Sequence, residues 1–308
     1  MGGACWRPID EGASGTRLQG VVVAAQDIRP VTALDSGSSD ALVGPSRSDR
    51  SPDAQQRVND QLWAGKRLVG AYANRELRPV EVVILVRYRD ALSGHVLELG
   101  SGAGRLTGYL AAIADSVVGI DLSPDMVEYS RRHYPGVDFR QGDIRDQSVF
   151  DAAPYDAIVA PYNIVDVLDD ADRQILLDRV CAALRPGGLF VMSSHNREVA
   201  GSLGDPLRLV GQSPTQAFLT VARWPRWWLN RRRLRAFERN EPSYAILNDV
   251  IHDYAGLHYY VTREAQEQQL ARHGFELREC LDLHGATIEP GDPAAHSSEL
   301  HYVAQRAG

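Results

Sequence analysis

The chain has 308 residues, 44% of them hydrophobic, and a formal net charge of −7. This length and apolar content suffice for one α/β domain with appended segments. The negative charge disfavours a bulk nucleic-acid binder, which normally presents a basic surface. The cysteines, Cys5, Cys181 and Cys280, have neither paired nor C-x-x-C spacing, so they indicate neither a disulfide framework nor a zinc site.

The first part of the chain, residues 1–55, is rich in Gly, Ser, Asp and Pro and has one short apolar patch at residues 21–25. Such a composition buries too little surface to offset chain entropy, so it predicts a mostly disordered leader. An over-long reading frame is an alternative explanation. The sequence has neither a signal-peptide pattern nor an apolar run approaching ~18 residues, so we expect a cytoplasmic protein.

Helical periodicity begins after the leader, in residues 56–92. Apolar side chains recur at helical spacing from Leu62 to Tyr72, and Pro79 is placed to open a second helix. We therefore expect N-terminal helices ahead of a main domain at residues 93–308.

A glycine-rich loop follows the next apolar stretch. Residues 96–99 predict a short buried strand, and Gly100, Gly102 and Gly104 then allow a turn with exposed backbone N–H groups. The following strand ends at Asp121, whose carboxylate can bind both hydroxyls of a ribose. A dinucleotide fingerprint would need a glycine where Arg105 stands.

The pattern E-x-G-x-G-x-G from Glu98 to Gly104, together with Asp121, resembles motif I of the class I S-adenosylmethionine-dependent methyltransferases. The resemblance implies an α/β, Rossmann-like fold: a seven-stranded, mostly parallel sheet with helices on both faces. It extends over about residues 85–305.

The remaining elements follow in the order that the family has. Pro161-Tyr162-Asn163 stands at the carboxyl end of the predicted fourth strand, where open α/β sheets bind ligands. The run Arg185-Pro-Gly-Gly188 ends a helix and is typical of the family. The sequence predicts strands at residues 137–144, 155–160, 189–194, 275–281 and 300–304, and helices at 172–184 and 262–273.

The resemblance also implies a cofactor, S-adenosylmethionine, with S-adenosylhomocysteine as product and no metal. In the family the acid matching Glu98 helps order the loop and the methionine moiety, the acid matching Asp121 binds the ribose, and an acid after strand three meets the adenine amino group. Leading helices cover the cofactor and often reach the methionine carboxylate, although Tyr72 and Arg75 would alternatively decorate a surface helix. The implied cofactor-binding residues are Tyr72, Arg75, Glu98, Gly100, Ser101, Gly102, Gly104, Asp121, Leu122, Met126, Gly142, Asp143, Ile144, Ala160 and Tyr162.

An insert at residues 196–260 separates the fifth strand from the next helix. From Arg223 to Arg239 it holds seven arginines, one glutamate and three of the five tryptophans, a net charge of +6. The family places variable substrate-binding insertions here, so we expect a helical substrate lid. Three explanations of the arginines are open: a solvated face, contact with an anionic small-molecule acceptor, and peripheral contact with a membrane. We favour the acceptor and expect no nucleic-acid partner.

Three residues are candidates for catalysis. His252 and Asp253 form an adjacent pair that could act as a general base, and His195 competes with them because it stands at the carboxyl end of strand five. A structural role is the alternative for each histidine taken alone. A metal site made by His195, His252 and His258 has no spacing signature.

We interpret the chain as a class I S-adenosylmethionine-dependent methyltransferase of a small-molecule acceptor, with O-methylation favoured over N- or C-methylation. Two alternatives from other classes are a nicotinamide-dependent oxidoreductase and a non-catalytic S-adenosylmethionine-binding protein.

Overall fold

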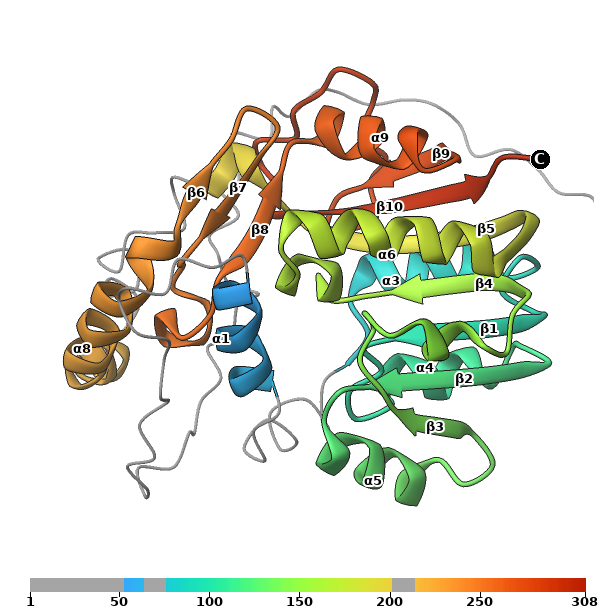
Figure 1. Cartoon of the computed structure of the whole chain (residues 1–308), viewed down its shortest axis with the longest axis horizontal. Coiled ribbons are helices and arrows are strands. Elements are labelled where there is room, and N and C mark those ends of the chain that lie inside the picture. The colour runs from blue at the N-terminus through green and yellow to red at the C-terminus, as the bar shows by residue number, and fades with distance from the viewer. Residues whose placement is uncertain (1–52, 64–75, 201–213) are drawn as a thin grey trace, which may run out of the picture. The chain divides into compact units, whose positions relative to one another are not determined.

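A computed structural model describes residues 53–63, 76–200 and 214–308 of the chain (Figure 1). Seven strands form its central sheet, and the five parallel ones reverse their order of pairing at β1 and β4. An open α/β sheet binds ligands at such a switch point, outside the carboxyl ends of its strands. The strand order is β3 (Asp138–Gln141), β2 (Ser116–Asp121), β1 (His95–Leu99), β4 (Tyr155–Ala160), β5 (Leu184–Asn196), β10 (Glu299–Arg306) and β9 (Phe275–Leu281).

The predicted sheet is confirmed, because β1 to β5 pair in parallel and β10 runs antiparallel to both β5 and β9. Strand five begins earlier than expected, at Leu184. Within β5, the stretch from Arg185 to Gly188 interrupts the regular pairing with β4, and the register shifts there. Gly187 in this stretch has a φ of +77°. A left-handed turn of this kind suits glycine, which has no Cβ to clash.

Helices cover both faces of the sheet. Successive side chains of a strand point to opposite faces, so neighbouring strand residues pack against different helices. Val96 of β1 and Val191 of β5 belong to a core cluster with α3 (Pro79–Arg87) and α4 (Arg105–Leu110). The neighbouring residues Leu97 and Phe190 belong to a second cluster with α6 (Asp170–Ala183) and α9 (Arg263–Arg272). A further helix, α5, spans Pro124–His133.

The insert after β5 contains a helix and also three strands that the sequence did not indicate, while its role as a substrate lid stays a prediction. Helix α8 spans Pro214–Leu234. The strands β6 (Arg239–Asn240), β7 (Tyr244–Leu247) and β8 (His258–Val261) extend the sheet, because Tyr260 and Val261 pair in parallel with His195 and Asn196 at the end of β5. This extension places residues of the insert beside the carboxyl end of strand five.

Helix α1 (Asp53–Trp63) connects the core to the insert. The buried amide of Asn59 donates to the carbonyl oxygens of Val167, at 2.7 Å, and Leu257, at 2.8 Å. Its Oδ1 accepts from the Leu257 N–H at 3.1 Å. In Figure 1 the arrowheads of β2 and β4 point toward the side where α1 and β8 lie, so this helix stands at the carboxyl end of the sheet.

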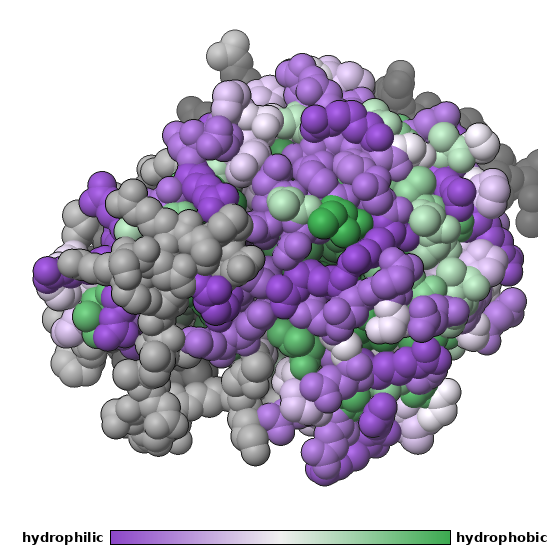
Figure 2. Space-filling model, in the orientation of Figure 1, coloured by the Kyte–Doolittle hydropathy of each residue, from purple (hydrophilic) through white to green (hydrophobic). Residues whose placement is uncertain are grey.

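One face of the surface and the apolar character of the helices can be described directly. Figure 2 shows a mostly hydrophilic face on which hydrophobic residues form small, separate groups. None of the helices in the described ranges has the length and apolar character that a membrane span needs.

Candidate active site

The glycine loop between β1 and α4 has the backbone that its sequence predicts. Gly100, Gly102 and Gly104 all have positive φ, between +53° and +80°. A Cβ at Gly100 would lie 2.5 Å from the Ile164 side chain, whereas a Cβ at Gly102 would meet nothing within 4 Å. Gly100 therefore allows close packing, and Gly102 leaves one side of the loop open for a ligand.

Asp121 anchors this loop from the end of β2. Its Oδ2 accepts the Gly102 N–H at 2.7 Å, and its Oδ1 accepts the Ser123 N–H at 2.9 Å. Burial raises the pKa of the Asp121 carboxyl, and these two N–H donors partly offset that rise. A carboxylate accepts about four hydrogen bonds, so about two remain for the hydroxyls of a ribose.

Glu98 lies beneath the loop rather than on its open side. It is buried, and its Oε2 accepts the Thr107 hydroxyl of α4 at 2.6 Å. Burial raises the pKa of Glu98 to about 8. The contact ties β1 to α4 and so orders the loop between them, while a contact of Glu98 with methionine stays a prediction.

Some of the other predicted cofactor residues lie beside the loop, and others lie in the core. Met126 packs against Ala103, with Trp63 of α1 beside them. Gly142 donates its N–H to the Asp121 carbonyl at 3.0 Å. Leu122 is half-buried, whereas Ile144 and Ala160 are buried in the core cluster on the α6 face.

Asp143 has a protein partner that the sequence did not indicate. Its Oδ1 accepts both the backbone N–H and the Nε–H of Arg145 at 2.9 Å. Arg145 also donates to Asp60 of α1 at 3.0 Å. Burial would raise the pKa of Asp143, but the Arg145 guanidinium lowers it overall. Arg145 thus links Asp143 to α1, and the predicted contact of Asp143 with adenine stays a prediction.

Three further predicted cofactor residues are Tyr72 and Arg75, expected at the methionine carboxylate, and Tyr162, expected at the end of strand four. Tyr72 and Arg75 lie outside the described residues. Tyr162 follows β4 with a φ of +56°, and its ring lies between two guanidiniums, 3.8 Å from that of Arg78 and 4.9 Å from that of Arg105. A flat aromatic ring attracts guanidinium cations to its faces, so Tyr162 fixes both arginines beside the loop.

The residues of the glycine loop fit S-adenosylmethionine. The Ser101 hydroxyl is buried and has no hydrogen-bond partner within the described structure. Beside it, Gly102 leaves open space and the Asp121 carboxylate can still accept hydrogen bonds. An unfilled buried polar atom calls for an explanation, and a polar ligand on this loop supplies one.

The second half of the site lies where β4 and β5 end. His195 is the penultimate residue of β5. Its Nδ1 lies 2.7 Å from Oδ2 of Asp166 in η3 (Ile164–Val167). That oxygen also accepts the His195 backbone N–H at 2.7 Å, while Oδ1 accepts the Ser194 hydroxyl at 2.6 Å and Arg173 Nη1 at 2.7 Å. With every acceptor position filled, Asp166 holds the neutral imidazole with its proton on Nδ1 and its lone pair on Nε2.

The charges around this dyad set the protonation of both groups. Asp166 and Arg173 are fully buried. Burial would raise the pKa of Asp166, but the Arg173 guanidinium and His195 lower it overall. Burial would lower the pKa of His195, but its bond to the Asp166 carboxylate raises it above its usual range. A histidine oriented by a carboxylate in this way can accept a proton.

Asn163 and Glu299 complete the surroundings of His195. Nδ2 of Asn163 lies 3.2 Å from Nε2 of His195 and 3.0 Å from Oε2 of Glu299. Glu299 is the first residue of β10, opposite His195 in the register, and it also pairs with Arg78. Because Ile164, next to Asn163, packs against Gly100, these residues connect the glycine loop with His195.

A second histidine–aspartate pair lies next to the first. Nδ1 of His258 is 3.0 Å from Oδ2 of Asp249, and the same oxygen accepts the Tyr260 hydroxyl. The His195 ring centroid lies 5.5 Å from that of His258 and 4.9 Å from that of Tyr260. Within the described ranges, no three His, Cys, Asp or Glu side chains form a group suited to a metal ion.

The predicted pair His252 and Asp253 has a different outcome. The side chain of His252 lies outside the described part of the chain. Asp253 has a φ of +60°, and its Oδ1 accepts the indole N–H of Trp227 at 2.7 Å, which ties η7 (Ile251–Tyr254) to α8. The contact seen for Asp253 is thus structural, and its role as a partner of His252 stays a prediction.

The arginines and tryptophans of α8 have mixed surroundings. Trp227 is 5% exposed, whereas Trp224 and Trp228 are 45% and 55% exposed. Arg231 donates to the Asn248 carbonyl at 3.2 Å, and the guanidinium of Arg232 lies 5.1 Å from the Trp228 ring. Contact of this segment with an anionic acceptor or a membrane stays a prediction.

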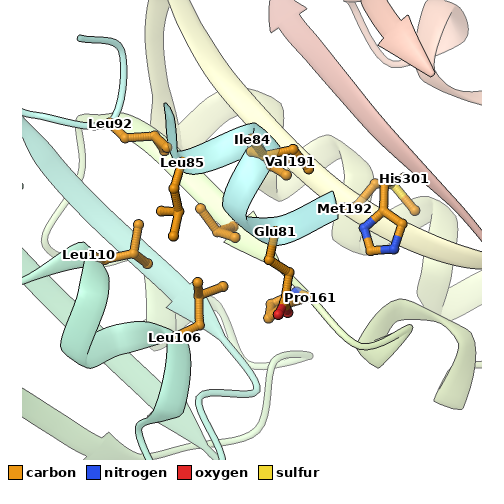
Figure 3. A pocket seen from close by; sticks show the side chains of 11 residues that line it. Glu81, Ile84, Leu85, Leu92, Leu106, Leu110, Pro161, Val191, Met192 and His301 are labelled. Atoms are coloured by element: carbon orange, nitrogen blue, oxygen red, sulfur yellow. The ribbon is translucent and has the colours of Figure 1, made fainter. Parts of the chain in front are cut away.

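One pocket that the structure forms is too small to bind a cofactor or an organic acceptor (Figure 3). Leucines of α3 and α4 line one end, and Glu81 and His301 lie toward the other. With a cavity volume of about 20 Å³, the pocket holds about one water molecule. Binding sites for organic ligands are much larger, so this pocket is a packing feature beside the site.

Sequence reasoning missed Asp166 and Glu299, and it placed Asn163 at a ligand-binding strand end without giving it a role. Asn163 and Asp166 do follow a predicted strand end, and parallel strands bring their carboxyl ends to one edge of the sheet. A search for acids after strand four would have found Asp166 as the partner of His195.

Comparison with known proteins agrees with the geometry. Residues 96–188 match the family described as methyltransferase domain. A ubiquinone biosynthesis O-methyltransferase of Methylocella silvestris is 32% identical over 180 residues, 50% of this chain and 66% of that protein. Its namesake in Xanthomonas axonopodis pv. citri is 29% identical over 129 residues, 40% of this chain and 52% of that protein. The chain thus spans about half to two thirds of the length of these relatives.

Solved structures show the same fold. An S-adenosylmethionine-dependent methyltransferase from Clostridium acetobutylicum aligns with a TM-score of 0.52 at 14% identity, over 77% of this chain and 94% of that chain. The CcbJ methyltransferase from Streptomyces caelestis aligns with a TM-score of 0.51 at 17% identity, over 80% and 98%. The matched domain and the relatives, together with the glycine loop, identify the chain as a class I S-adenosylmethionine-dependent methyltransferase, and the solved structures share its fold.

Proposed function

We propose that the chain transfers a methyl group to a hydroxyl of a small molecule, with His195 as the general base. The observation that carries this proposal is the buried contact of 2.7 Å between Nδ1 of His195 and Asp166. A hydroxyl is a weak nucleophile until a base takes its proton, whereas a neutral amine needs mainly alignment. The two relatives described above, both named O-methyltransferases, support the same choice.

The chain's residues divide the work between two ends of the site. Asp121 and the glycine loop would hold the cofactor, which supplies an electrophilic methyl group when bound. At the other end, Nε2 of His195 takes the proton of the acceptor hydroxyl as the oxygen bonds to the methyl carbon, whose bond to the cofactor sulfur would break and release S-adenosylhomocysteine. The Asp166 carboxylate stabilises the imidazolium that results, and the proton then leaves to solvent.

His195→Gln tests this role, because glutamine keeps a polar side chain but cannot accept the proton. We expect kcat for a phenol probe to fall by about 100- to 10,000-fold, the usual contribution of a general base. Affinity for S-adenosylhomocysteine should stay unchanged, since Asp121 and the glycine loop bind it. Release of S-adenosylhomocysteine measures turnover, and calorimetry measures affinity.

His284→Gln is the matched control, because His284 is exposed and far along the chain from the dyad. Phenols, amines and thiols serve as probe acceptors. Equal turnover of phenols by the wild type and His195→Gln would refute the base. Turnover of amines alone would favour N-methylation, and no turnover of any probe would favour a non-catalytic binding protein.

A further inference from the structure

The side chain of Asn163 is held in one orientation by its backbone. Asn163 follows Tyr162, and both have a φ of +56°, a conformation that asparagine tolerates better than most residues. The Asn163 N–H donates to the Ser193 hydroxyl of β5 at 2.7 Å. Two left-handed residues in succession are costly and persist only where the surrounding structure holds them in place.

The amide of Asn163 uses its nitrogen but not its oxygen. Nδ2 donates to Glu299 at 3.0 Å and approaches Nε2 of His195 at 3.2 Å, so both of its protons are engaged. Oδ1 is buried and accepts no hydrogen bond from the residues that the structure describes, although Asn163 is only 7% exposed. Exchanging the two amide atoms would set Oδ1 against the Glu299 carboxylate, so the assignment is settled by charge.

We infer that Asn163 binds the methyl acceptor, and that its Oδ1 accepts a hydrogen bond from a second O–H or N–H donor next to the reacting hydroxyl. The inference rests on the proposed function. The reacting O–H displaces the Asn163 amide from Nε2 of His195, and the neighbouring donor bonds Oδ1. Oδ1 belongs to the same amide group whose Nδ2 lies 3.2 Å from Nε2 of His195, so the two groups of the acceptor lie close together, as in a vicinal diol or an amino alcohol.

A pair of matched probes tests this preference. 1,2-Dihydroxybenzene carries the second donor, and 2-methoxyphenol has a similar size but lacks it. A buried acceptor that stays unpaired penalises the second probe, so we expect the wild type to favour the diol by about 10-fold or more in kcat/KM. Phenol and 2-aminophenol extend the series, and 2-aminophenol should behave as the diol does.

Asn163→Gly removes the amide and suits the positive φ. It should bring the ratio of the two kcat/KM values close to 1 and leave S-adenosylhomocysteine affinity unchanged. Asn163→Asp tolerates the same backbone and keeps an acceptor oxygen, so it should retain a preference for the diol.

The outcomes separate this inference from the proposed function. A wild-type ratio near 1 overturns the inference even if no variant folds, while turnover of phenols upholds O-methylation. An unchanged ratio in Asn163→Gly, or a loss of S-adenosylhomocysteine affinity with the ratio preserved, would assign Oδ1 elsewhere. No turnover of any phenol would overturn the proposed function and this inference together.

Discussion

Asp166 determines what His195 can do. The carboxylate receives hydrogen bonds from Arg173, Ser194 and two nitrogens of His195, and no part of it is exposed. Its negative charge raises the pKa of His195 against the opposing effect of burial. The base form of His195 is the deprotonated one, so activity should rise with pH through a pKa above the usual 6.5.

Asp166→Asn removes that charge and keeps the shape. The pKa of His195 should fall, so the rising limb of kcat/KM against pH should move to lower pH, with a lower plateau because the imidazolium loses its counter-ion. Ser194→Ala removes a hydrogen bond to Asp166 without changing charge, so it should move the limb less. A limb at the same pH in Asp166→Asn and the wild type would show that another group titrates.

The same pKa shifts also link folding to pH. His195 has a raised pKa in the folded state. Its contribution to the free energy of unfolding is therefore fully present below pH 6.5 and is lost as pH rises through the raised pKa. Asp166 has a lowered pKa, so its contribution is present above pH 3.8 and is lost as pH falls through the lowered value. The dyad therefore stabilises the fold most between these two pH values.

At the scale of elements, α1 joins the two ends of the site. Asn59 bonds the segment after β4 to Leu257 of the insert, while Asp60 bonds Arg145, the partner of Asp143. Trp63 packs beside Ala103 and Met126 at the glycine loop. This single helix thus contacts both the predicted cofactor loop and the acceptor end.

Asn59→Ala should weaken that connection. It leaves buried backbone groups of Val167 and Leu257 without partners, and each unsatisfied group costs about 1–3 kcal/mol. We expect the free energy of unfolding to fall by at least that amount, measured by urea denaturation. Gln61→Ala, at an exposed position of the same helix, should leave it nearly unchanged. Equal stability of the two variants would mean that α1 is not held through Asn59.

At the scale of the whole molecule, the sequence predicted what depends on local pattern. The glycine loop and Asp121 lie within a short stretch, and apolar runs marked the strands of the central sheet. The contacts that complete the site join residues far apart in the chain, such as Asn163 with Glu299, 136 positions on, and Asn59 with Leu257, 198 positions on. No local pattern carries such pairings. Strands β6 to β8 were missed because the arginine-rich stretch before them suggested only a helix.

The cofactor loop is the central feature of the site, and calorimetry with S-adenosylhomocysteine tests it. Asp121→Ala removes a carboxylate expected to accept ribose hydroxyls, and hydrogen bonds to a charged group contribute about 1.5–3 kcal/mol each. The wild type should bind S-adenosylhomocysteine but not NADH, and Asp121→Ala should bind it at least about 10-fold more weakly. Glu128→Ala, an exposed acid on the adjacent helix, should bind as the wild type does. Equal affinity of Asp121→Ala and the wild type, or binding of NADH in place of S-adenosylhomocysteine, would contradict the assignment.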